Sequence, residues 1–311
     1  MTAQTSILGP DWIAVDWGTS SLRVWAIAAD GSILARRSAQ DGMGSLARDS
    51  YEDALLRLVG EFLPHGSGAP IPVVICGMAG AKTGWAEAGY RQAPCTPLAR
   101  DGMIRVETRD KRLDVRILSG ISQMSPADVM RGEETQLAGL TSRIGAETAV
   151  ACLPGTHSKW VRLGKGRIAS FKTFMTGELF AVMAEHSILR LSADTRDEDR
   201  DAFRSAVRDI QDRPLDLTAA LFSIRASSLI EGLGAAAARS RLSGLLIGAE
   251  LAATKDLWRV NPVHLVGSDR LADAYASAIE ALGGTCFREH SEEITLAGLA
   301  VARKLIGEAV S

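Results

Sequence analysis

A short pattern occurs twice in this chain, about half a chain apart. Around each copy an apolar stretch leads into Gly-Thr-x-Ser, and a second apolar stretch, a glycine-containing turn and a third stretch follow. Four identities can arise by chance, and β-hairpins often carry such turns, but the shared order of elements favours a duplication. A shift of 137 positions aligns the copies, placing Ala14, Gly18, Thr19 and Ser21 on Ala151, Gly155, Thr156 and Ser158.

The apolar patterning predicts two α/β domains, at residues 1–145 and 146–311, with the last helix packing back toward the first domain. In the first domain we expect strands at 12–16, 21–28, 32–37, 72–76 and 115–119, a turn at 120–122, and helices from Ser50 and across 129–140. In the second we expect strands at 149–153, 160–163, 167–172, 262–267 and 285–288, and helices at 177–189, 203–210, 218–239, 244–254, 270–282 and 295–306. The charged stretch 192–213 is expected to be a solvated insertion or cap.

Composition and charge exclude several classes of protein. The 35 basic and 37 acidic residues give a net charge of −2 and form no basic block, so no nucleic-acid partner is expected. No apolar run approaches the roughly 20 residues that a bilayer requires, and the nearest, 245–253, contains Glu250. No signal-peptide pattern opens the sequence, so we expect a cytoplasmic protein with a small-molecule partner and no membrane, and a homodimer is compatible with the sequence.

The four cysteines do not form a recognisable framework. Cys76, Cys95, Cys152 and Cys286 are far apart in the sequence, which argues against structural zinc and against a disulfide scaffold. Cys76 and Cys152 lie in apolar runs and are expected to be small buried hydrophobes. A nucleophilic role is the less favoured alternative, because no histidine lies near either in the sequence.

The two Gly-Thr turns have a composition suited to phosphate. A strand that ends in such a turn exposes backbone N–H groups, and its hydroxyls add further donors. Asp16, at the end of a buried strand, suits a hard cation such as Mg²⁺, whereas the second turn has Pro154 at that place. His157 and Lys159 lie beside the second turn, although a surface histidine and a solvated lysine are the structural alternatives. The predicted phosphate-binding residues are Gly18, Thr19, Ser20 and Arg23, with Gly155, Thr156, His157 and Lys159.

Two adjacent acids, Glu133 and Glu134, stand among apolar positions of a predicted helix. At helical spacing Glu133 shares a stripe with Val129 and Leu137, where an acid is costly to bury unless it is paired. If one of the two acids faces a cleft, partial desolvation would raise the pKa of that acid toward the value of a general base. The alternative is a pair of first-turn acids favoured by the helix dipole. Of the two, Glu134 is the preferred candidate.

A strand at 263–266 runs into Gly267-Ser268 and then a helix, which suits the close approach of a flat ring or ribose to the backbone. With the two phosphate turns, this motif resembles the actin, hexokinase and heat-shock-chaperone group of ATP-binding proteins. The resemblance implies two ribonuclease-H-like (actin-like) domains, each a mixed sheet flanked by helices, with a central cleft. It also implies ATP and Mg²⁺ as cofactors, with Asp16 as the metal ligand.

Further motifs make the chain similar to the 2-dehydro-3-deoxygalactonokinases. They are Val15–Arg23, Gly77–Gly80 with Gly84-Trp85, Ile121–Gln123, Met130–Gln136, Pro154–Trp160 and Phe174–Glu178. The resemblance implies transfer of the γ-phosphoryl group of ATP to the 6-hydroxyl of 2-dehydro-3-deoxy-D-galactonate in galactonate degradation. It implies Lys82, Trp85 and Arg131 as substrate residues. Gly80-Ala81-Lys82-Thr83 departs from the family's usual Gly-Ser-Arg-Gln, and a lysine would meet a carboxylate as a point charge rather than a bidentate fork.

The predicted mechanism gives Asp16 the metal, the two turns the phosphates, and Glu134 or Glu133 the proton of the attacking hydroxyl. Arg23 or Lys159 would neutralise charge on the transferred group. Two alternatives remain open: an exopolyphosphatase-like hydrolase, and an ATP-switched binding protein that does no chemistry on a small molecule.

Overall fold

Two mixed sheets, one of six strands and one of five, organise the computed structural model, which describes residues 9–64 and 68–307. Five strands of the first sheet have counterparts in the same order in the second. The described residues fall into two units. The first contains residues up to Ala146, Gly166–Ile168 and the chain from Glu292 onward, and the second contains Glu147–Lys165 and Ala169–Ser291. Each unit is described by itself below.

The sheet of the first unit has the order β3-β2-β1-β4-β7-β6. Its strands are β1 (Trp12–Trp17), β2 (Leu22–Ile27), β3 (Ile33–Ala39), β4 (Ile71–Gly77), β6 (Met103–Val106) and β7 (Leu113–Leu118). β1 is antiparallel to β2 and parallel to β4, which is in turn parallel to β7. A separate three-stranded sheet joins β5 (Tyr90–Gln92), β8 (Gly120–Met124) and β9 (Ala127–Met130).

The sheet of the second unit repeats this arrangement in the order β12-β11-β10-β13-β14. Its strands are β10 (Ala149–Leu153), β11 (Ser158–Gly164), β12 (Arg167–Phe174), β13 (Val263–Gly267) and β14 (Cys286–His290). β10 is antiparallel to β11 and parallel to β13, as β1 is to β2 and β4. The element order predicted from the repeated pattern is confirmed, and so is the fold class of two ribonuclease-H-like domains.

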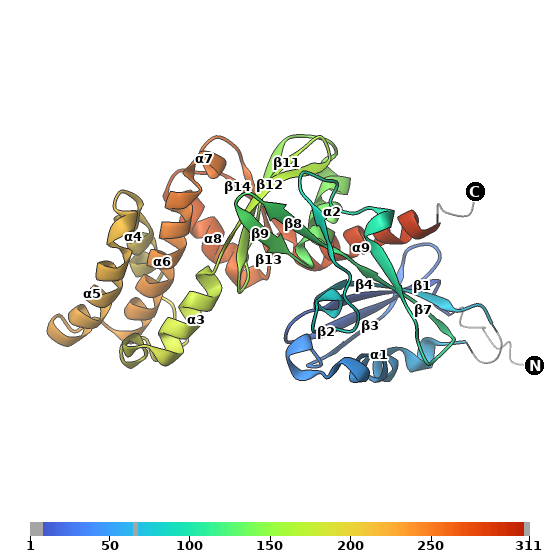
Figure 1. The fold of residues 1–311 in the computed structure, drawn as a ribbon. Coiled ribbons are helices and arrows are strands. Elements are labelled where there is room, and N and C mark those ends of the chain that lie inside the picture. The colour runs from blue at the N-terminus through green and yellow to red at the C-terminus, as the bar shows by residue number, and fades with distance from the viewer. Residues whose placement is uncertain (1–8, 65–67, 308–311) are drawn as a thin grey trace, which may run out of the picture. The chain divides into compact units, whose positions relative to one another are not determined.

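Helices cover both faces of the first sheet, which explains why its central strands are apolar on both sides. Along β1, Ile13 and Val15 face the core under α1 (Tyr51–Val59), while Trp12 and Ala14 face the core under α9 (Ser291–Gly307). Figure 1 shows α1 and α9 on opposite sides of this sheet. The last helix of the chain therefore completes the core of the first unit.

Two glycines allow α9 to cross α2 (Glu133–Ile144) at very short range. A Cβ added to Gly139 would lie 2.0 Å from the carbonyl oxygen of Ile294, and one added to Gly298 would lie 1.9 Å from that of Thr135. Neither distance leaves room for a methyl group, so the crossing requires glycine on both helices.

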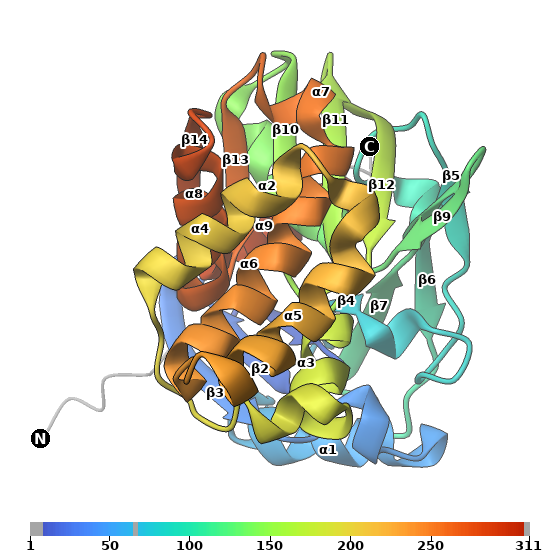
Figure 2. The same ribbon diagram turned by 90° about the vertical axis from the view of Figure 1, so that its left-hand side faces the viewer.

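Helices form a thick layer on the second sheet. α4 (Arg200–Gln211), α6 (Ala235–Ala253) and α8 (Asp269–Ala281) contribute to the core against the strands, with the short α7 (Lys255–Trp258). Beyond them, α3 (Thr176–His186) and α5 (Leu217–Ile230) pack with α4 and α6 around a further apolar cluster. Figure 2 shows α5, α6 and α4 side by side. No described helix has both the length and the apolar character needed to cross a bilayer.

Several sequence-based expectations are wrong in whole or in part. The predicted helix 218–239 is two helices, α5 and α6, because Gly232 (φ +71°) breaks the chain between them, and the predicted helix 244–254 is the end of α6. The predicted turn 120–122 lies in β8, and Val129 and Met130 lie in its partner β9 rather than in a helix. The stretch 192–213 is only partly solvated, since α4 buries Phe203, Val207 and Ile210.

The α2–α9 crossing predicts a large effect of Gly139→Ala on stability. The added methyl group would force the helices apart, and overpacking of this kind lowers the free energy of unfolding by about 3 kcal/mol. Gly60→Ala is the matched control, because Gly60 has a helical φ of −54° and nothing within 4 Å of an added Cβ. Urea unfolding measures both variants, and an unchanged midpoint for Gly139→Ala would contradict the close crossing.

Candidate functional site

In the first unit, the ends of β1 and β4 meet the start of α2. Trp17 pairs with Gly77 at the last position of the two parallel strands. A Cβ on Gly77, which has a φ of +88°, would lie 2.5 Å from the carbonyl oxygen of Trp17, and a Cβ on Gly132 would lie 3.4 Å from the Cα of Gly77. Glycine at both places lets three chain segments converge on Asp16, the penultimate residue of β1.

Asp16 is held by its neighbours in a polar setting. It pairs across the hairpin with Arg23, and their side chains form an ion pair. The Cys76 thiol donates to Asp16 Oδ1 at 3.7 Å. Burial, with the charges of Asp16 and Glu134, raises the pKa of Cys76 well above its ordinary value, so this thiol stays protonated and is not a nucleophile.

The Gly18–Ser20 turn is anchored through its carbonyl groups. The N–H groups of Met43 and Gly44 donate to the carbonyl oxygens of Gly18 (3.0 Å) and Thr19 (2.8 Å). The side chains of Thr19 and Ser20 are exposed. The turn thus presents two hydroxyl groups on a fixed backbone beside Asp16.

The two candidate acids form the first turn of α2, as the alternative based on the helix dipole expected. Glu133 Oε2 accepts from the Arg131 N–H at 3.0 Å, and Glu134 Oε2 accepts from the Gly132 N–H at 2.7 Å. Glu134 has no exposed surface, and burial followed by the charge of Glu133 raises its pKa to about 8. Glu133 keeps part of its surface exposed. The prediction that Glu133 shares a helical apolar stripe with Val129 is wrong, because Val129 lies in β9 and the helix begins at Glu133.

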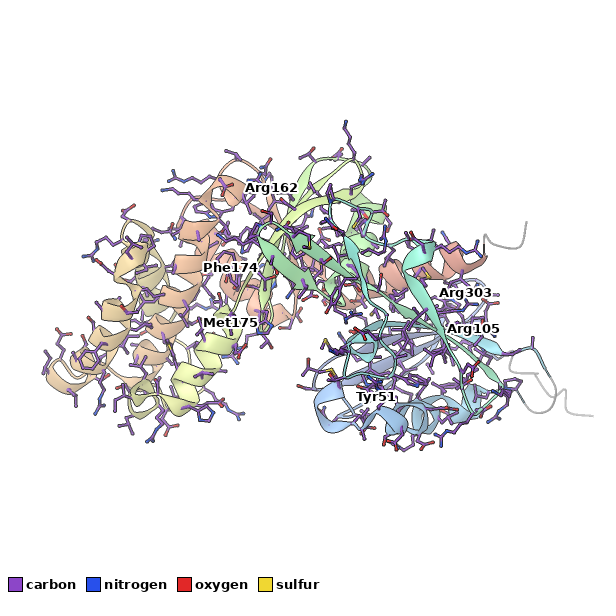
Figure 3. The ribbon with its side chains drawn as sticks, in the orientation of Figure 1. Tyr51, Arg105, Arg162, Phe174, Met175 and Arg303 are labelled. Carbon is purple, nitrogen blue, oxygen red and sulfur yellow. The ribbon has the colours of Figure 1, made fainter. Side chains whose placement is uncertain are left out.

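The predicted substrate residues lie on the loops of the same unit. Lys82 is exposed, and its carbonyl oxygen accepts from the Arg48 guanidinium. The Trp85 ring stacks on Tyr51 with centroids 6.2 Å apart, and Figure 3 labels Tyr51. Arg131 lies over the Tyr90 ring at 4.4 Å, and its Nη2 donates to the Gly89 carbonyl at 2.8 Å.

In the second unit, a cavity of about 950 Å³ lies beside the second Gly-Thr turn. Three predicted residues line it, namely Gly155, Thr156 and Ser268, from the ends of β10 and β13. Gly267, His157 and Lys159 are not among its lining residues. Side chains from α3, α4, α6 and α8 complete the wall.

The turn beside this cavity rests on the start of α3. A Cβ on Gly177 would lie 2.3 Å from the Gly155 carbonyl oxygen, and the Glu178 N–H donates to the Thr156 carbonyl at 2.9 Å. His157 Nε2 lies 2.5 Å from Glu178 Oε2. Figure 3 labels Phe174 and Met175, where β12 leads into this helix. The turn is therefore fixed from below by a helix N-terminus.

Lys159 differs from the solvated lysine that was one alternative. Its side chain is 5% exposed, and its Nζ donates to the His157 carbonyl oxygen at 3.2 Å. The ammonium group thus lies directly behind the backbone of the second turn. A buried cation there favours negative charge at the turn.

Sequence reasoning missed several polar residues around the cavity. Two ion pairs stand in its wall, Arg270 with Glu198 at 3.0 Å and Arg288 with Asp273 at 2.7 Å. Behind the wall, Glu250 is 3% exposed and accepts hydrogen bonds from several elements. The one available signal was a single acid within an otherwise apolar stretch of helix, which is costly to bury without partners.

Comparisons with known proteins agree with each other. The family model described as 2-keto-3-deoxy-galactonokinase matches residues 16–302. A protein of Rhizobium meliloti (strain 1021) named a probable 2-dehydro-3-deoxygalactonokinase is 43% identical over 301 residues, covering 95% of this chain and 97% of the relative. The 2-dehydro-3-deoxygalactonokinase of Escherichia coli (strain K12) is 32% identical over 276 residues, covering 88% and 90%. A crystal structure of a Sinorhizobium meliloti protein assigned the same activity superposes with a TM-score of 0.85 at 40% identity, covering 95% of this chain and 99% of the other.

The raised pKa of Glu134 predicts a pH-dependent stability. The folded chain holds this proton to about pH 8, whereas the unfolded chain releases it near 4.5, so the contribution of Glu134 is full below about pH 4.5 and is lost as the pH rises to about 8. The loss is up to about 1.4 kcal/mol per pH unit. Glu134→Gln removes this slope, and urea unfolding at pH 5.5, 6.5 and 7.5 compares the two proteins. Parallel slopes would show that Glu134 titrates normally.

Proposed function

This chain belongs to the 2-keto-3-deoxy-galactonokinase family, and on that ground we propose that it transfers the γ-phosphoryl group of ATP to the 6-hydroxyl of 2-dehydro-3-deoxy-D-galactonate. The single observation that carries the nucleotide part is the cavity beside the second Gly-Thr turn. We propose a cytoplasmic location, where ATP is available, and a homodimer stays a prediction.

The cavity of the second unit has the size and chemistry for a nucleotide. Its volume of about 950 Å³ lies within the range of ligand sites. Gly155 and Thr156 offer backbone and hydroxyl groups to the phosphates, next to the N-terminus of α3. Ser268 lies between β13 and α8, where the backbone can approach the ribose. The ammonium group of Lys159 adds positive charge behind the turn.

Asp16 fits the role of a magnesium ligand. Within the described residues, no group of three or more His, Cys, Asp and Glu side chains is arranged to hold a metal ion. Mg²⁺ bound with ATP needs only one or two carboxylates besides phosphate oxygens and water, and the partly exposed Asp16 offers one. When bound, the ion would neutralise charge on the β- and γ-phosphates. We propose that Arg23, which forms an ion pair with Asp16, shares that role.

We propose that the first unit binds the sugar acid, which accepts the phosphoryl group. One acid of the pair at the start of α2 takes the proton of the 6-hydroxyl. Glu133 keeps exposed surface and can reach a substrate without rearrangement, whereas Glu134 has the raised pKa but no exposed surface. Lys82, Trp85 and Arg131 orient the sugar acid, with Lys82 as the exposed cation available to its carboxylate.

The proposal predicts that the release of ADP depends on the presence of 2-dehydro-3-deoxy-D-galactonate. A coupled ADP-release assay compares the galactonate-derived and gluconate-derived 2-keto-3-deoxy acids, and we expect faster turnover of the former. Hydrolysis of polyphosphate without a sugar acid would instead indicate an exopolyphosphatase. Tight ATP binding with no turnover of any sugar acid would indicate a switched binding protein.

Asp16→Asn is expected to lower kcat by about 100-fold, because the variant loses the charge that positions the metal and keeps the shape of the side chain. The assay is repeated across a magnesium titration. Asp30→Asn is the control, since Asp30 is an exposed acid in a hairpin turn, where its Oδ1 accepts from the Ser32 N–H. Near wild-type turnover of Asp16→Asn at saturating Mg²⁺ would rule out the metal role.

A further inference from the structure

Glu250 is a buried acid in the second unit to which the proposed mechanism gives no role. It lies on α6, is 3% exposed, and accepts hydrogen bonds from three other elements. Oε1 accepts from Trp160 Nε1 at 2.7 Å. Oε2 accepts from Ser158 Oγ and Tyr275 Oη, both at 2.8 Å, and from Thr176 Oγ1.

Three of these donors stand in the cavity wall or directly after the turn that lines it. Ser158 follows the Gly155–His157 turn directly and begins β11. Thr176 is the first residue of α3 and lines the cavity, as does Tyr275 on α8. Glu250 therefore connects, behind the cavity wall, the phosphate turn, the helix beneath it and the helix that follows Gly267-Ser268.

The donor set suits a carboxylate. The indole N–H of Trp160 can only donate, and the three hydroxyl groups can all donate to an acceptor that has no proton of its own. The pKa of Glu250 is raised above its ordinary value, because burial outweighs the bonds from Thr176, Trp160 and Ser158, which lower it. A buried acid is costly unless its hydrogen bonds are satisfied, and here four donors satisfy it.

A core of apolar side chains could fill this space without that cost, because buried ionic groups are often replaced by hydrophobic residues with little loss of stability. Apolar contacts, however, are not directional, whereas hydrogen bonds are. Four hydrogen bonds to one carboxylate fix the positions of β11, α3 and α8 relative to one another. They therefore fix the shape of the cavity beside these elements.

We infer that Glu250 is a positioning residue for nucleotide binding. It acts by holding the Gly155–His157 turn and the start of α3 in a fixed position relative to α8. The inference rests on the proposed function, in which this cavity takes ATP. Since the sugar-acid residues belong to the first unit, the loss of Glu250 changes the binding of nucleotide and leaves the binding of sugar acid unchanged.

The test compares Glu250→Gln with the wild-type chain in ATP titrations by calorimetry and in steady-state kinetics. The amide replaces one acceptor oxygen with a donor, and we expect the Kd and KM of ATP to rise by about tenfold, as for the loss of one hydrogen bond to a charged group. The KM of the sugar acid stays at its wild-type value. Tyr275→Phe and Thr176→Val each remove one donor, and we expect the same direction with smaller effects.

Glu52→Gln is the matched control. Glu52 on α1 is also a buried acid, 6% exposed, and it accepts from the N–H groups of Arg109 (3.0 Å) and Asp110 (2.7 Å). We expect this variant to lower the melting temperature and leave the Kd of ATP unchanged.

The outcomes separate the inference from the proposed function. If the wild-type chain binds no ATP, the proposed function fails. If the wild-type chain binds ATP and Glu250→Gln binds it equally well, or if Glu52→Gln raises the Kd of ATP as much as Glu250→Gln does, the positioning role is overturned. If Glu250→Gln does not fold, Tyr275→Phe and Thr176→Val decide the question by the same ATP titration.

Discussion

The ends of parallel strands control both candidate sites. In each unit the first strand runs beside a parallel partner, so the two carboxyl ends reach the same edge of the sheet. A turn that leaves such an edge brings backbone N–H groups and short polar side chains together without further structure. Glycine is required where neighbouring segments approach this edge, at Gly77 in the first unit and at Gly177 in the second, because a Cβ would collide with a backbone oxygen.

Much of the architecture could be predicted from the sequence. The repeated Gly-Thr turns and the apolar strands around them gave the correct order of elements, because strands buried on both faces have a clear apolar signature. The helix boundaries were less predictable. Gly132 (φ +101°) directly precedes α2, and Gly232 (φ +71°) lies between α5 and α6. A glycine inside an apolar periodic pattern does not reveal in advance which way the backbone turns.

The site was only partly predictable, for a physical reason. Turn residues such as Gly155 and Thr156 carry their chemistry in local sequence, so they could be found directly. Glu250 could not, because its hydrogen-bond partners Ser158, Thr176 and Tyr275 come from distant parts of the chain. The burial of Lys159 and Glu134 was hidden in the same way, since exposure is a property of the packed structure and not of the neighbouring residues.

The return of α9 to the first unit has a consequence for synthesis on the ribosome. Trp12, Ala14 and Cys76 share a core with Leu299 and Ala302, so β1 and β4 lack this cover until α9 has been synthesised. Translation at about 5–20 residues per second leaves that apolar face uncovered for many seconds. A fragment that ends at residue 146 would keep it permanently open to water, and is expected to aggregate unless the α9 peptide is supplied in trans.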